Sequence, residues 1–209
     1  MATPVTSSRP FQAGTGGWSA ADLDDPDIAR QWDEGRFEIV EGVLSSMPAA
    51  YLDSSRALKR LVRVVERHLD DAGIGGEVDL EVDFVAAGNR VPRVDAVYMT
   101  PEDDRRQQQA NANRGRRDLK YGRLLVPPTL IIECLSIGHE AHDRLTKRAW
   151  YAQAKAPNFW LLDPFARALD CLVLDGADYR LDQAGRGNDE VRPALFPGLI
   201  IQLAKVWAR

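Results

Sequence analysis

Hydrophobic positions recur along this chain with two different periods. Between residues 54 and 71 they fall at i, i+3, i+4, i+7 and i+11 counted from Leu58, which predicts an amphipathic helix. Residues 77–85 alternate between acidic and apolar, and residues 91–99 form a second apolar segment, so we expect two strands joined by a turn at residues 87–89. The same alternation over residues 37–44, interrupted by a Glu-Gly pair, predicts a strand or a tight hairpin.

The most apolar stretch runs from Pro128 to Ser136 and contains one carboxylate, Glu133. A strand of this composition is expected to be buried on both faces. An ionised carboxylate is costly to remove from water unless a cation, a metal ion or several hydrogen-bond donors compensate it. The sequence therefore predicts that Glu133 has a partner inside the protein.

The C-terminal part of the chain predicts one further helix and three further strands. The helix is expected from about residue 142 to residue 155, because Pro157 prevents its continuation. Residues 158–164 predict a buried strand, and residues 169–174 predict its antiparallel neighbour. A last strand is expected at residues 199–203.

Three segments lack a clear hydrophobic period. Residues 1–17 are rich in Thr, Ser, Gly and Pro and predict a flexible tail before a single domain at 18–209. Residues 19–22 resemble a capping box and predict a short helix before Pro26. Residues 101–120 are rich in Gln, Asn and Arg and predict a mobile basic loop, which is either a phosphate-neutralising arm or a disordered insertion.

Composition narrows the class of protein. The chain has 209 residues with 44% hydrophobic and 28% charged residues, which is ordinary for a soluble globular domain. No segment approaches the roughly 20 apolar residues that span a bilayer, and no signal-peptide core is present, so we expect a cytoplasmic protein without membrane association. Cys134 and Cys171 lie in apolar runs and predict buried thiols rather than a metal site. A net charge of −4 neither requires nor excludes a nucleic-acid partner.

Acidic residues on the predicted strands suggest a metal site. A mixed sheet would place Asp95, Glu133 and Glu81 on neighbouring strands, and carboxylates that converge repel one another unless a hard cation such as Mg²⁺ lies between them. For Glu81, a solvent-exposed strand face is the simpler interpretation. On the following helix, Lys147 lies four residues after Asp143 and four before Tyr151. The Asp–Lys spacing is typical of a helix-stabilising pair, but Lys147 could also reach back towards the carboxylates.

The ordered set of segments resembles the bacterial Uma-type "putative restriction endonuclease" family, within the PD-(D/E)XK nuclease superfamily. The resemblance covers about residues 18–203, and no single motif carries it. The matching segments are Arg36–Gly42, the amphipathic helix, Val91–Val97, Pro128–Ser136, Asp143 through Lys147 to Tyr151, and Phe159–Pro164.

This resemblance implies an α/β, restriction-endonuclease-like fold with a mixed central β-sheet flanked by helices. It also implies Mg²⁺-dependent cleavage of phosphodiester bonds, with Mn²⁺ as a substitute. By position, Asp95 and Glu133 match the two metal-binding acids, Glu38 matches a further acid that completes the site, and Glu81 matches an acidic strand position. The implied partner is double-stranded DNA, cut by a homodimer.

Two departures from the superfamily pattern affect the site. Leu135 occupies the position where the superfamily usually has a lysine, and the resemblance assigns that role to Lys147 on the next helix. Pro92 lies three residues before Asp95, with Val94 directly preceding the acid. In addition, Ser136-Ile137-Gly138 stands where family members often have Ser-Pro-Ser, which changes a loop but no acid.

Two other functions remain as alternatives. The chain could be a catalytically inactive nuclease-fold protein that binds DNA or another protein. A cysteine hydrolase using Cys134 with His139 or His142 is disfavoured, because strand alternation places Cys134 on the face opposite Glu133 and no oxyanion-hole glycine pattern accompanies it.

Overall fold

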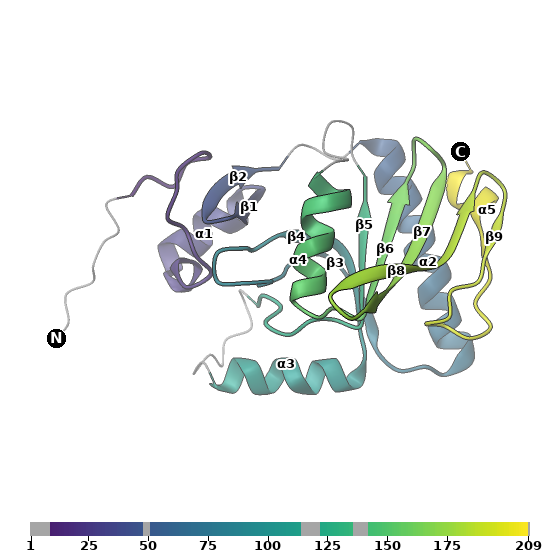
Figure 1. Cartoon of the computed structure of the whole chain (residues 1–209). Helices are drawn as coiled ribbons and strands as arrows, with labels where there is room; N and C mark the ends of the chain where they lie inside the picture. The colour runs from purple at the N-terminus through teal and green to yellow at the C-terminus, as the bar shows by residue number, and fades with distance from the viewer. Residues whose placement is uncertain (1–8, 48–50, 114–121, 136–141, 209) are drawn as a thin grey trace.

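A mixed six-stranded sheet forms the centre of the protein (Figure 1). The computed structural model describes residues 9–47, 51–113, 122–135 and 142–208. The strand order is β3-β4-β5-β6-β7-β8, in which β5 and β6 are parallel and the other neighbours antiparallel. The strands are β3 (Glu77–Asp83), β4 (Arg93–Met99), β5 (Leu130–Cys134), β6 (Asn158–Asp163), β7 (Ala168–Asp175) and β8 (Asp178–Arg186). The expected mixed sheet with flanking helices is confirmed.

Helices cover both faces of this sheet (Figure 1). The long helix α2 (Leu52–Ala72) packs on one face, where its residues Leu61 and Val65 join a core with Ile132 of β5. The π-helix η3 (His142–Lys147) and the helix α4 (Arg148–Gln153) lie on the other face, where Tyr151 packs with Ile131. Alternation along β5 thus divides its side chains between two cores.

A small N-terminal unit packs beside the sheet and positions one predicted site residue. It consists of the 3₁₀ helix η1 (Asp22–Asp24), the helix α1 (Pro26–Glu34) and the hairpin β1 (Phe37–Val40)–β2 (Val43–Ser46). The hairpin turns at Glu41 and Gly42, both with positive φ, as a two-residue turn requires. Ile39 exchanges two backbone hydrogen bonds with Val91, just before β4. This contact places the hairpin next to the end of β4.

The predicted flexible tail is wrong for the residues that the structure describes within it. Backbone hydrogen bonds join Gly14 and Thr15 to Leu44 of β2, and the Phe11 ring packs against Trp18 and Phe37. Residues 1–8 lie outside the described residues. The segment is ordered by contacts distant in sequence, which local composition does not indicate.

The predicted mobile loop is wrong for residues 101–113, which form the helix α3 (Pro101–Asn113). Thr100 and Asp103 form a reciprocal cap, since each accepts a hydrogen bond from the other's backbone N–H. Asp103 also accepts hydrogen bonds from the N–H and hydroxyl of Thr129, and Gln107 bonds to the backbone at Arg123 and Leu125. Polar tertiary contacts therefore hold a helix that has no hydrophobic period. Residues 114–120 lie outside the described residues.

The C-terminal region forms a short ribbon and a helix. β9 (Glu190–Val191) pairs with β10 (Ile201–Gln202), and the helix α5 (Leu203–Trp207) follows directly. The strand expected at residues 199–203 is thus shorter than predicted. No helix within the described residues is long and apolar enough to cross a membrane.

Candidate active site

Asp95 and Glu133 lie on adjacent antiparallel strands. Ala96 of β4 is paired with Ile132 of β5, and Asp95 and Glu133 are the residues next to this last pair. Oδ2 of Asp95 accepts a hydrogen bond from the backbone N–H of Cys134 at 2.7 Å. Sheet pairing therefore brings the two predicted carboxylates to the same end of the sheet.

The partners of Glu133 come from the helical segment that follows its strand. Glu133 is 2% exposed, and its Oε1 accepts a hydrogen bond from the hydroxyl of Tyr151 on α4. The ammonium of Lys147 lies 3.4 Å from the same oxygen. A hydroxyl and a cation thus compensate the buried carboxylate that the apolar strand carries.

Glu38 reaches the same ammonium from the N-terminal hairpin. Its Oε1 lies 2.8 Å from Nζ of Lys147 and accepts a hydrogen bond from the backbone N–H of Arg93 at 3.0 Å. Glu38 is 6% exposed and Lys147 4% exposed, so this ion pair is largely shielded from water. The pairing of Ile39 with Val91 explains the position of Glu38, because it sets the hairpin beside β4.

The site side chains that the structure describes carry more negative than positive charge. Glu38, Glu133 and Asp95 contribute three carboxylates and Lys147 one ammonium, which leaves a net charge of minus two when all four are ionised. Hard oxygen donors with an excess of negative charge are the donor set that Mg²⁺ takes in proteins, where one or two carboxylates are completed by waters and substrate phosphates. The residues present therefore fit a divalent cation.

Glu81 stands apart from this group. Its backbone has φ of 52°, outside the strand region, and its side chain is 60% exposed and forms an ion pair with Arg36 at 3.4 Å. Among the described residues, no three His, Cys, Asp or Glu side chains gather closely enough to hold a metal ion together. The structure thus gives Glu81, a predicted metal ligand, a contact with Arg36.

Four residues at or beside the site were not among the predicted site residues. Tyr151 was detectable, because it lies one helical turn after Lys147 on the same face. Arg93 and Asp83 form a bidentate ion pair at 2.8 and 3.2 Å, and Trp32 donates a hydrogen bond to Asp83. Burial lowers the pKa of Arg93, but the hydrogen bond and charge of Asp83 outweigh it and raise this pKa above its ordinary value. No local pattern in the sequence indicates this pair, which depends on the register of β3 against β4.

Cys134 lies on the other face of its strand from Glu133. Its sulfur is 3.5 Å from the carbonyl oxygen of Ser54 on α2, whereas Glu133 contacts Lys147 and Tyr151. His139 lies outside the described residues, and so does the side chain of His142.

A family model also matches this chain. The model of the Uma2 family, described as "Putative restriction endonuclease", matches residues 26–204. The chain belongs to the Uma2 family. The residues matched by the family model include Glu38, Asp95, Glu133 and Lys147.

A solved structure supports the fold of this Uma2 protein. It is described as a "putative nuclease" from Anabaena variabilis and is 15% identical to this chain, with a TM-score of 0.61. The similarity covers 84% of this chain and 91% of that chain. No curated protein matches the sequence. Two findings therefore bear on function: membership of the Uma2 family, and a fold shared with a protein described as a putative nuclease.

Proposed function

We propose that this Uma2 protein is a metal-dependent endonuclease that hydrolyses phosphodiester bonds in DNA. The observation that carries the proposal is the contact of one buried ammonium, on Lys147, with two carboxylates that arrive from different elements, Glu38 and Glu133. An ammonium with two carboxylates is costly to remove from water, and this arrangement is more typical of a functional site than of a hydrophobic core.

Asp95 and Glu133 would hold the metal ion, Mg²⁺ or Mn²⁺. When bound, the ion supplies Lewis-acid stabilisation of the phosphoryl oxygens and lowers the pKa of a coordinated water. Asp95 is anchored by the N–H of Cys134, and Glu133 by the hydroxyl of Tyr151. Both acids are thus held in place by groups on rigid elements, which limits the reorganisation required during the reaction.

Lys147 acts on the substrate in this proposal. Its ammonium can orient the attacking water or stabilise negative charge that develops on the phosphate. Glu38 positions the ammonium, and the N–H of Arg93 in turn holds Glu38. Tyr151 acts through Glu133 and is a positioning residue.

Plasmid cleavage with Mg²⁺ or Mn²⁺ tests the proposal. Asp95→Asn keeps the shape of the side chain and removes its charge, and we expect cleavage to fall by at least about 100-fold, as for loss of a catalytic electrostatic group. Asp79→Asn, at an exposed position of the neighbouring strand β3, is the matched control and should cleave like the wild type. Equal cleavage by wild type and Asp95→Asn would remove Asp95 from the mechanism.

A catalytically inactive nucleic-acid-binding or protein-interaction module is the second candidate. It is favoured by one observation, that Lys147 already neutralises part of the carboxylate charge within the described site. Binding to DNA that weakens steeply with salt, without cleavage under any divalent cation, would support this function. Double-stranded DNA as the partner and a homodimeric state are further parts of the endonuclease proposal, checked by comparing duplex with single-stranded substrates and by analytical ultracentrifugation.

A further inference from the structure

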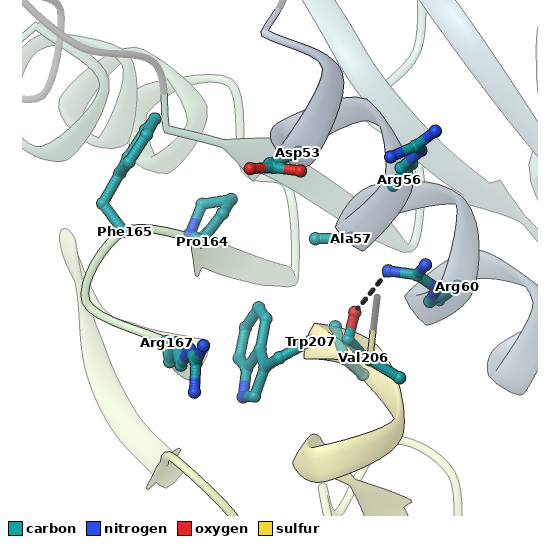
Figure 2. Close-up of a pocket in the computed structure, with 10 residues that line it drawn as sticks. Asp53, Arg56, Ala57, Arg60, Pro164, Phe165, Arg167, Val206 and Trp207 are labelled. Atoms are coloured by element: carbon teal, nitrogen blue, oxygen red, sulfur yellow. Dashed lines mark hydrogen bonds between the residues drawn. The ribbon is translucent and has the colours of Figure 1, made fainter.

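A polar cavity lies at the same end of the sheet as Glu133. It has a volume of about 250 Å³ and is formed by the first turns of α2, the turn between β6 and β7, and the end of α5 (Figure 2). Arg56 and Arg60 enter it from α2, and Arg167 enters it from the turn. We call this cavity the arginine pocket.

The arginine pocket carries an excess of positive charge. The described residues that line it include three arginines and one acid, Asp53. Arg60 donates a hydrogen bond to the carbonyl oxygen of Val206 at 3.3 Å, and within the described part of the chain none of the three arginines forms an ion pair. Guanidinium groups with available donors are well suited to phosphate, which they bind in a planar, bidentate geometry.

Aromatic side chains border the pocket. Phe165 is 48% exposed, lines the cavity and meets the exposed ring of Tyr51 edge to face at 6.1 Å. Oδ1 of Asp163 accepts hydrogen bonds from the N–H groups of Phe165 and Ala166, so the turn that presents Phe165 is held in one conformation. Exposed aromatic rings next to arginines are the combination with which proteins bind nucleic-acid strands, by stacking on bases and contacting phosphates.

The pocket and the candidate active site are linked through two strand ends. The N–H of Leu135, two residues after Glu133, donates to the carbonyl oxygen of Leu162, just before the turn that carries Phe165 and Arg167. The hydroxyl of Ser54 on α2 is 3.5 Å from the carbonyl oxygen of Leu135. The pocket therefore begins at Pro164, directly after β6, on the α2 face, whereas Lys147 and Tyr151 contact Glu133 on the α4 face. A nucleic-acid strand that crosses this end of the sheet would contact both the arginine pocket and the candidate active site.

We propose that the arginine pocket binds a backbone phosphate of the nucleic-acid substrate on one side of the bond to be cut, with Phe165 stacking on an adjacent base at a point where the strand is unpaired. The inference rests on the proposed function for the identity of the ligand. It adds a substrate-binding subsite formed by Arg56, Arg60, Arg167 and Phe165. An acidic peptide is a less suitable occupant, because it would use the arginines but not the exposed ring.

Binding measured without hydrolysis tests this subsite separately from catalysis. Fluorescence anisotropy of a short labelled single-stranded DNA is recorded in EDTA over a range of salt concentrations. The pocket variant combines Arg56→Gln with Arg167→Asn; neither side chain makes a hydrogen bond within the described residues, and Asn tolerates the positive φ of 49° at position 167. The control combines Arg63→Gln with Arg67→Gln, which removes the same charge from exposed positions further along α2.

We expect the pocket variant to bind about tenfold or more weakly, as for the loss of charged hydrogen bonds, while the control binds like the wild type. The slope of log K against log salt should fall by roughly 0.7 for each arginine that neutralises a phosphate. Phe165→Leu should weaken binding without changing this slope. Thermal unfolding checks that the pocket variant is folded.

The outcomes separate the two proposals. If the pocket and control variants bind equally, or if the wild type does not bind DNA at low salt, the subsite is wrong, whatever the plasmid assay shows. If binding depends on the pocket but the wild type does not cleave, the subsite stands and the endonuclease function fails. Binding of an acidic peptide of equal charge, with the same loss in the pocket variant and no effect of Phe165→Leu, would also overturn the nucleic-acid assignment.

Discussion

The hydroxyl of Tyr151 donates a hydrogen bond to Oε1 of Glu133, the same oxygen that lies 3.4 Å from the ammonium of Lys147. Tyr151 is fully buried and its ring packs against Phe159. This hydrogen bond fixes the orientation of Glu133, which would bind the metal. Tyr151 itself need not touch the substrate. It therefore separates the positioning of Glu133 from the chemistry proposed for Lys147.

Tyr151→Phe keeps the packed ring and removes the hydroxyl that donates to Glu133. We expect a loss of about 1–3 kcal/mol in the free energy of unfolding, because a buried carboxylate loses a donor. Cleavage should fall about tenfold and require a higher Mn²⁺ concentration. Tyr179→Phe is the matched control, since its buried hydroxyl donates to the carbonyl oxygen of Ala156 away from the site. A similar loss of cleavage in both variants would reduce the role of Tyr151 to stability.

Lys147→Met leaves Glu38 and Glu133 buried without their cation. Breaking a buried ion pair in this way costs about 3–5 kcal/mol, so we expect a large loss in the free energy of unfolding by urea and no detectable cleavage. Adding Glu38→Gln to Lys147→Met should restore part of the stability, because it removes one uncompensated charge, but not the activity. Strictly additive losses in this double-mutant cycle would show that the two side chains do not interact.

Cys134→Ser is expected to cleave like the wild type. The contact of residue 134 with Asp95 uses its backbone N–H, which serine retains. A thiol reagent should also modify the half-buried Cys134 faster than the buried Cys171, because burial and the nearby carboxylates of Asp182 and Asp170 raise the pKa of Cys171. Loss of cleavage in Cys134→Ser would return the cysteine-hydrolase hypothesis to consideration.

The lowered pKa of Asp103 predicts how the free energy of unfolding depends on pH. Burial alone would raise the pKa of its carboxyl, but hydrogen bonds from Thr129 and Thr100, together with Arg106, lower it below the ordinary value of 3.8. Because the folded state holds the charged form, this stabilisation is fully present above the pKa of the unfolded chain and is lost as the pH falls through the folded pKa. We expect Asp103→Asn to cost about 1–3 kcal/mol at pH 6 in urea unfolding. The difference in the free energy of unfolding between Asp103→Asn and wild type should shrink below about pH 3.8. A difference that stays constant with pH would contradict this prediction.

The hydrophobic pattern predicted most of the sheet and the long helix correctly. Alternation identified β3 and the hairpin β1–β2. The helical period identified α2, because this helix buries one face against the core. The helix α3 was missed because its stability comes from the cap between Thr100 and Asp103 and from side-chain bonds to distant backbone, which have no period. The helix α1 was not predicted either, although Asp25 caps it and Pro26 occupies its first position.

The sequence by itself determined that Glu133 would be a buried acid, since an apolar strand carries it whatever its neighbours are. Only the tertiary structure decided what compensates it. The register of β4 against β5 sets Asp95 beside it, the hairpin's contact with Val91 brings in Glu38, and the segment after β5 returns Lys147 and Tyr151 to its oxygen. Strand register and packing connect residues far apart in the chain, and the local spacing of side chains does not encode those distances.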